Sequence, residues 1–246
     1  MSAADTSLPS SMTSAASAAP LAESDNGLAH AGTAVAGAAP VAFSPTLGSG
    51  EAEELQRAEL YGLLARLWLE APDEALLGEF RVAVTEAPQA GGFLQEPWQQ
   101  LVAAMRATTV VEARAEHDAL FHAVGRPEVF VYGSYYLSGF LNEKPLAALR
   151  ADLAALGLDR DRDRLETEDH VSFVLEVMRY LIAGEDASVC NLEQQRRFFR
   201  THVQTWVEAL CDAVEAHPRT HTWRAVAAMT RAFVQVETQA FDMLEA

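Results

Sequence analysis

The chain has 246 residues, of which 50% are hydrophobic and 22% are charged, and its formal net charge at pH 7 is −17. This composition is typical of a folded globular protein, and no apolar run reaches the roughly 18–20 residues of a membrane-spanning helix. The negative charge disfavours nucleic acid as a partner, because it repels a phosphate backbone, and it suits a basic partner. The two cysteines, Cys190 and Cys211, have neither CxxC nor metal-binding spacing, which fits a reducing compartment.

Residues 1–50 are rich in Ala, Ser, Thr, Gly and Pro and contain neither Lys nor Arg. Such a segment buries too little apolar surface to offset the entropy lost on ordering, so it predicts a disordered tail. The first basic residue, Arg57, lies beyond the place where a secretory signal carries its positive charges. The sequence therefore predicts a cytoplasmic protein with a disordered tail at 1–50 and one helical domain at 51–246.

From residue 51 onward, apolar residues recur at the spacing of an α-helix, and start and stop signals divide this part into seven or eight helices. In chain order the signals are Pro72, Asp73, Pro97, Thr109 with Glu112, Pro145, Gly157, Thr167, Gly184, Asn191 with Gln194, Pro218 and Trp223. A single long helix is predicted between Asn191 and Pro218. Residues 125–144 are predicted to be irregular, and their β-prone part, Glu128–Leu137, has no evident partner strand. The predicted fold is all-α, a compact single-domain helical bundle.

The sequence lacks the common signatures of catalysis. The only lysine, Lys144, does not follow a glycine-rich run, so a phosphate-binding loop is excluded, and neither GxSxG nor HExxH occurs. Glu166 and His170 are four residues apart, but Thr167 is predicted to cap a helix between them, so they need not share a face. The sequence predicts no catalytic residue, no metal site and no cofactor. A helical metal- or nucleotide-dependent enzyme using Glu166, Asp169 and His170 remains the alternative.

Two segments carry the candidate functional residues. The first is Tyr132-Gly-Ser-Tyr-Tyr-Leu137, followed by Glu143-Lys-Pro-Leu146, and the second is Glu168-Asp169-His170. In order and spacing they resemble the central signature of the TorD/DmsD/NarJ family of molybdoenzyme maturation chaperones. The resemblance covers about Glu51–Phe241 and extends to Leu120-Phe121, Leu149-Arg150, Phe198-Phe199, His202 and Trp206. The Asp-Arg repeat at 159–164 and Trp223 depart from the family's pattern.

The resemblance implies a binding protein rather than an enzyme. Its partners would be the twin-arginine signal peptide and the apo-form of a molybdopterin oxidoreductase, which it would hold for cofactor insertion and keep from early export. It would act as a monomer or a domain-swapped dimer. Asp169 would accept a guanidinium, and His170 would bond to the peptide backbone or orient that carboxylate. The implied signal-peptide residues are Glu168, Asp169, His170, Tyr132, Ser134, Tyr135 and Tyr136.

Each of these features also has a purely structural interpretation. Acidic residues are favoured in the first turn of a helix, so Glu168-Asp169-His170 would then merely start one, in an adaptor without a signal-peptide site. At least one of the three tyrosines is expected to fill the core. Helical spacing also places Phe199 and Trp206 in the core and makes His202 a hydrogen-bonding residue between helices.

Overall fold

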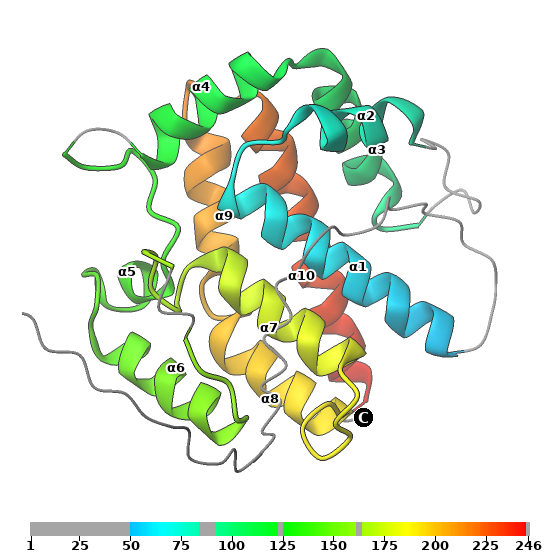
Figure 1. Cartoon of the computed structure of the whole chain (residues 1–246), viewed down its shortest axis with the longest axis vertical. Coiled ribbons are helices and arrows are strands. Elements are labelled where there is room, and N and C mark those ends of the chain that lie inside the picture. Colours follow the sequence, from blue (N-terminus) through cyan, green and yellow to red (C-terminus); the bar gives the residue numbers. More distant parts are fainter. Residues whose placement is uncertain (1–49, 84–91, 123–124, 161–163, 245–246) are drawn as a thin grey trace, which may run out of the picture. The chain divides into compact units, whose positions relative to one another are not determined.

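The computed structural model describes residues 50–83, 92–122, 125–160 and 164–244 (Figure 1). The tail predicted at 1–50 lies outside these residues, apart from Gly50, at which the first helix begins. The described residues form ten helices and no strand, so the all-α prediction is confirmed. The helices are α1 (Gly50–Leu69), α2 (Glu74–Val82), α3 (Gln95–Ala107), α4 (Val110–Phe121), α5 (Gly133–Ser138), α6 (Lys144–Ala155), α7 (Val171–Ala183), α8 (Leu192–His202), α9 (Val207–Ala216) and α10 (Thr222–Met243).

Local capping signals define many of the helix ends, as the sequence predicted. Asp73, Thr109 and Asn191 each accept a hydrogen bond from the backbone N–H three residues further on, at 2.8, 3.3 and 3.1 Å. Gly157 ends α6 in the left-handed conformation, with φ +72°. The N–H groups of Gly157 and Leu158 bond back to the carbonyls of Ala154 and Leu153, which satisfies the end of the helix.

The helix count exceeds the prediction of seven or eight for two reasons. The segment predicted to be irregular contains the short helix α5, and the long helix predicted between Asn191 and Pro218 is broken into α8 and α9. At the break, the Trp206 indole N–H donates to the carbonyl of His202 at 2.7 Å. The backbone N–H of Trp206 bonds instead to Val203, at 3.3 Å. A side chain has thus replaced a helical backbone hydrogen bond, which interrupts the helix.

The helices α1, α7 and α10 all contribute to the core. Figure 1 shows α1 and α7 as neighbouring ribbons in similar orientation, with α10 behind them. Arg57 of α1 forms a two-pronged ion pair with Glu237 of α10, at 2.7 and 2.9 Å, and the Tyr61 hydroxyl donates to the same carboxylate at 3.0 Å. Glu237 is 2% exposed, so these bonds satisfy a buried charge. The network therefore joins the first and last helices through fully paired groups.

A carboxylate from α4 caps the start of α10. Glu116 accepts hydrogen bonds from the backbone N–H groups of His221, Thr222 and Trp223, at 2.8, 3.0 and 3.0 Å. These are among the donors that a helix N-terminus leaves without partners inside the helix. The α4 helix therefore supplies the cap that the sequence preceding α10 lacks.

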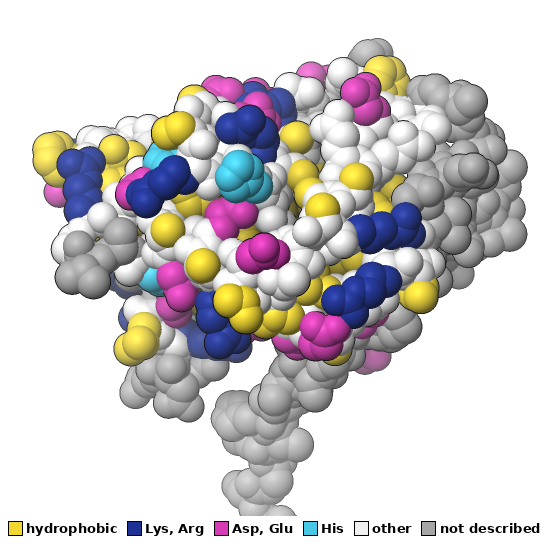
Figure 2. All heavy atoms as spheres, turned by 90° about the horizontal axis from the view of Figure 1, so that it is seen from above, with side chains coloured by type: hydrophobic (Ala, Val, Ile, Leu, Met, Phe, Trp, Pro, Cys, Tyr) yellow, Lys and Arg dark blue, Asp and Glu magenta, His cyan; other side chains and the backbone are white. Residues whose placement is uncertain are grey.

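The surface mixes charges of both signs. On the face shown in Figure 2, acidic and basic side chains are interspersed, and hydrophobic side chains are scattered among them. Within the described ranges, no helix combines the length and apolar character required to cross a membrane.

Candidate functional site

The two motif segments meet in the folded chain. The Gly133 N–H donates to the Asp169 carbonyl, and the Val171 N–H donates to the Val131 carbonyl, both at 2.8 Å. Tyr132 and His170 thereby form an isolated antiparallel bridge. The β-prone stretch that lacked an evident partner in the sequence thus pairs with the residues just before α7. This pairing brings together residues that are more than 30 positions apart.

Asp169 links the segments through its side chain. One carboxylate oxygen accepts the backbone N–H of Ser134 at 2.9 Å, in the first turn of α5, and the other accepts the Thr167 hydroxyl at 2.6 Å. Asp169 is 3% exposed. The prediction that Thr167 caps the following helix is wrong, because its hydroxyl bonds to Asp169 and His170 is the cap of α7. Asp169 acts as the remote cap of α5, a helix with no side-chain cap of its own.

His170 is held as a neutral ring. Its Nδ1 accepts the backbone N–H of Ser172 at 3.1 Å, and its ring lies edge-on to Tyr132 with centroids 5.2 Å apart. Burial lowers the pKa of His170 to about 3, despite the opposing effect of the Asp169 carboxylate. An Nδ1 that accepts a hydrogen bond cannot carry a proton, so the geometry and the pKa agree.

The three tyrosines occupy different environments. Tyr136 is partly buried and packs against the core, where its hydroxyl donates to the Phe130 carbonyl at 2.8 Å and its ring stacks on Trp206. Tyr135 is partly exposed and stacks on the Phe130 ring, with centroids 4.1 Å apart. Tyr132 is half-buried, and burial together with the charges of Glu166 and Asp169 raises its pKa. The expectation that at least one tyrosine fills the core is therefore met only in part, because Tyr132 and Tyr136 pack against the core but remain partly exposed.

Glu168 is the carboxylate at this site that holds a guanidinium. Arg150 of α6 donates from Nε and Nη2 to its two oxygens, at 3.0 and 2.8 Å. Burial alone would raise the pKa of Glu168, but the hydrogen bonds and charge of Arg150 lower it below its usual value. The Arg150 side chain is 48% exposed, against 12% for Glu168. Sequence reasoning noted Arg150 only as part of the family pattern and missed its pairing with the motif.

Ser134 connects Asp169 to the loop between α5 and α6. It is 1% exposed, and its hydroxyl accepts the backbone N–H of Asn142 at 3.3 Å. The Ser138 hydroxyl donates to the Ser134 carbonyl at 2.7 Å, four residues back within α5. Ser134 is therefore a residue that positions this loop.

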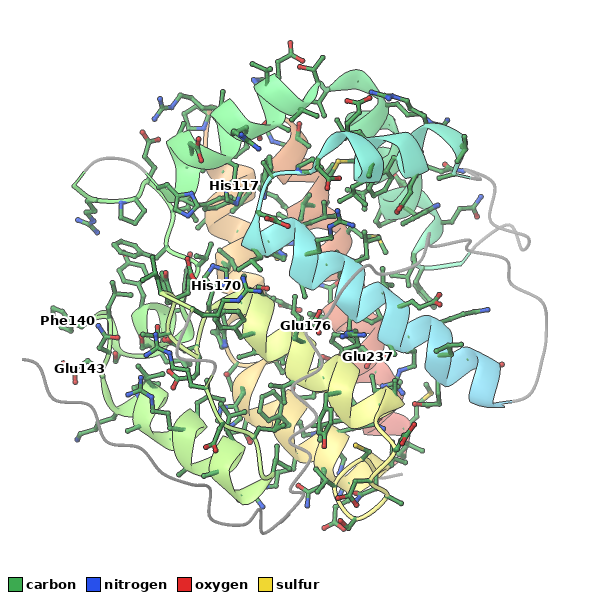
Figure 3. All side chains as sticks on the ribbon, viewed as in Figure 1. His117, Phe140, Glu143, His170, Glu176 and Glu237 are labelled. Carbon is green, nitrogen blue, oxygen red and sulfur yellow. The ribbon has the colours of Figure 1, made fainter. Side chains whose placement is uncertain are left out.

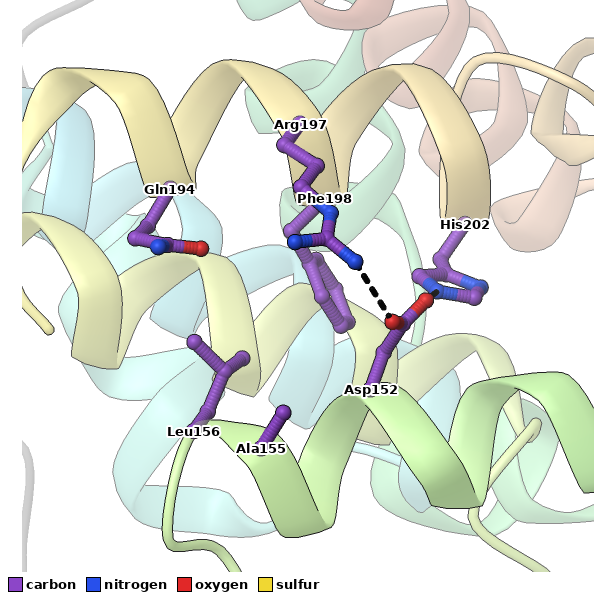
Figure 4. Close-up of a pocket in the computed structure, with 7 residues that line it drawn as sticks. All are labelled: Asp152, Ala155, Leu156, Gln194, Arg197, Phe198 and His202. Carbon is purple, nitrogen blue, oxygen red and sulfur yellow. Dashed lines mark hydrogen bonds and ion pairs between the residues drawn. The ribbon is translucent and has the colours of Figure 1, made fainter.

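A small pocket lies on the other side of α6, where it faces α8 (Figure 4). Its volume is about 60 Å³, which suits no more than a few water molecules. Asp152 bridges the two helices, accepting from Arg197 at 3.0 Å and lying 2.8 Å from His202 Nε2. Burial lowers the pKa of His202, against the opposing pull of Asp152. The prediction that His202 is an interhelix hydrogen-bonding residue is confirmed.

One group among the described residues has the composition of a metal site. The ligand atoms of His117, Asp118 and His122 all lie within 4.8 Å of one another at the end of α4. The His-Asp-x-x-x-His spacing could have revealed it in the sequence. This group of three residues does not contain Glu166, Asp169 or His170, the residues on which the alternative enzyme hypothesis rests. The polar atoms of Asp169 and His170 Nδ1 are already bonded to protein groups.

Comparison with known proteins places the chain in a family. The sequence model of the family described as nitrate reductase delta subunit matches residues 89–212, half of the chain. The chaperone protein TorD of Vibrio cholerae serotype O1 is 25% identical over 205 residues, which cover 77% of this chain and 93% of the relative. A Psychrobacter chaperone protein TorD is 30% identical over 146 residues, covering 55% and 65%. The chain therefore belongs to the nitrate reductase delta subunit family, the TorD/NarJ family of molybdoenzyme maturation chaperones.

Proposed function

We propose that the protein is a cytoplasmic chaperone that binds the twin-arginine signal peptide and the apo-form of a molybdopterin oxidoreductase. It holds this client while the cofactor is inserted and delays its export. The names of the relatives support a chaperone role. The observation that carries the proposal is that the two motif segments meet at Asp169 and His170, next to Glu168, a carboxylate that already binds an arginine in two-pronged geometry.

An arginine of the client would replace Arg150 at Glu168. Paired N–H···O bonds between a guanidinium and a carboxylate are strong and depend on the planar shape of the arginine head group. Arg150 can be displaced without being left buried and unpaired, because its side chain is about half exposed and water can replace Glu168 as its partner. The net charge of −17 adds long-range attraction for a basic peptide. Glu168 would thus exchange an internal arginine for an external one.

Asp169 and His170 would hold this site in shape. The prediction that Asp169 itself receives an arginine remains a prediction, and it requires the guanidinium to share oxygens that already accept from Ser134 and Thr167. Tyr132, Tyr135 and Glu166 are partly exposed next to these residues and offer further contact to the peptide.

Calorimetric titration with a synthetic peptide that carries two arginines followed by an apolar run tests the proposal. Wild type should bind, and replacing both arginines by lysines should weaken binding, because lysine cannot form the fork. Glu168→Gln should lose about tenfold in affinity, the scale of a charge-assisted hydrogen bond. Arg150→Ala should bind at least as tightly as wild type, since it removes the competitor.

The matched control is Glu59→Gln, which removes an exposed carboxylate from α1 and should leave the affinity unchanged. Absence of binding to wild type would refute the proposed function. Equal losses in Glu168→Gln and Glu59→Gln would leave only general charge attraction and would contradict the role of Glu168.

A further inference from the structure

The last turn of α5, which contains Leu137, and the loop that follows it display large apolar side chains to solvent. Leu137, Phe140 and Leu141 are 44%, 71% and 41% exposed and lie within five residues of one another. Single exposed apolar residues are ordinary, but a cluster on one loop is typical of an interaction surface. We define these three residues as the apolar loop.

The backbone of the apolar loop turns at two residues with positive φ. Gly139 ends α5 with φ +81°, and Asn142 has φ +59°, where residues other than glycine are uncommon. The Ser138 hydroxyl is also 3.2 Å from the Phe140 carbonyl. Such conformations persist where the surrounding structure enforces them, often at binding sites. These bonds and turns therefore set the course of the loop backbone that carries Phe140.

The motif residues enforce this conformation. Asp169 binds the Ser134 N–H, and the Ser134 hydroxyl binds the Asn142 N–H. One chain of hydrogen bonds thus runs from the residue next to Glu168 to the end of the apolar loop. The proposed arginine acceptor and the apolar loop are held by the same framework.

Charge and position favour a peptide with a basic and an apolar part. Figure 3 shows Phe140 and Glu143 close together at the outer end of the α5–α6 turn, away from His170. Glu143 is exposed, as is the adjacent Lys144, so the turn itself carries no net charge. The carboxylate of Glu168 binds Arg150 of α6, which follows Glu143 by seven residues. An apolar surface and a separate acidic acceptor match a segment in which arginines precede an apolar run.

We infer that Leu137, Phe140 and Leu141 form the docking surface for the apolar run that follows the paired arginines of the client's signal peptide. This inference rests on the proposed function. It assigns the arginines of the peptide to Glu168 and the apolar run to the apolar loop. Asp169 and Ser134 are positioning residues for this surface.

The test uses the full chain and the same twin-arginine peptide. Phe140→Ala should lower the affinity about tenfold, because the phenyl ring buries its apolar area only in the complex. The heat capacity change of binding should also become less negative. Phe93→Ala is the matched control, since Phe93 is 78% exposed at a different place, and it should bind as wild type does.

The outcomes separate this inference from the proposed function. Failure of wild type to bind the peptide would refute both. Binding by wild type with equal affinity in Phe140→Ala would overturn the inference and leave the function standing. A dimer of the wild type, detected by sedimentation and dissociated by Phe140→Ala without a change in peptide affinity, would assign the apolar loop to a second copy and would also overturn it.

Discussion

Two carboxylates, Glu116 and Asp169, each cap a helix that belongs to a distant part of the chain. Glu116 receives three backbone N–H groups at the start of α10, a helix of 22 residues. Asp169 receives one N–H group at the start of α5, a helix of six residues, together with the hydroxyl of Thr167. The number of hydrogen bonds alone would make Glu116 the more important residue.

The two helices depend on their caps to different degrees. The α10 helix buries ten side chains in the core, so packing holds it whether or not it is capped. The α5 helix is too short to persist alone, and its buried residues are only Gly133 and Ser134. Its position follows from Asp169, from the bridge to His170 and from the contact of Tyr136 with Trp206. A single hydrogen bond therefore matters more where less else holds the helix.

Substitution of Asp169 should have the largest effect. Asp169→Ala leaves the buried Ser134 N–H and Thr167 hydroxyl without their acceptor, which should cost about 2–3 kcal/mol of unfolding free energy. It should also release the apolar loop. Asp169→Asn keeps an oxygen for Ser134 and an N–H for the Thr167 hydroxyl, so it should cost less than about 1 kcal/mol. Urea unfolding of the two variants measures the difference, and equal costs would contradict the capping role.

His170 should make the same region sensitive to acid. Its folded pKa of about 3 lies below the ordinary value of 6.5. Between these values the unfolded chain binds a proton that the folded chain does not, so stability is full above pH 6.5 and falls as the pH decreases towards 3. Between pH 7 and pH 5, the titration of His170 lowers the free energy of unfolding by about 2 kcal/mol.

His170→Asn removes the titration and keeps a side chain that can cap α7. Urea unfolding of both proteins at pH 7 and pH 5 isolates the contribution of His170 from those of the other buried histidines. An identical pH dependence in wild type and variant would show that folding does not lower the pKa of His170.

Substitution of Glu116 should have the smallest effect. Glu116→Ala should cost about 1 kcal/mol of unfolding free energy, the usual loss of a cap on a helix that packing retains. Glu116→Gln should fall between wild type and Ala, because the amide keeps one acceptor oxygen. Neither change should alter peptide affinity. A larger cost than that of Asp169→Ala would reverse the ranking of the two caps.

Much of the fold could be predicted because its signals are local. The caps at Asp73, Thr109 and Asn191, and the glycine end at Gly157, use groups within a few residues of each helix terminus. Such short-range bonds depend only on residue type and spacing. The error at Thr167 has the same origin, because a threonine before an acidic pair is a plausible local cap until Asp169 takes its hydroxyl.

The parts that could not be predicted depend on contacts between distant residues. No residue close to α5 in the sequence indicates that the helix is capped, because its cap is the distant Asp169. The break between α8 and α9 depends on where the Trp206 indole points, and that is decided by packing against Tyr136 and Gly133. The sequence named the two motif segments, but their pairing and the bonds by which Asp169, Ser134 and Thr167 hold one another became visible only in the fold.

The position of Trp206 makes it an optical reporter for α5. A Cβ added at Gly133 would lie 3.0 Å from its indole, and its ring centroid is 5.8 Å from that of Tyr136. The other three tryptophans, Trp68, Trp98 and Trp223, lie on α1, α3 and α10. A displacement of α5 would change the exposure of the Trp206 indole to solvent. The tryptophan fluorescence of this protein would therefore report on the position of the helix that bears the motif.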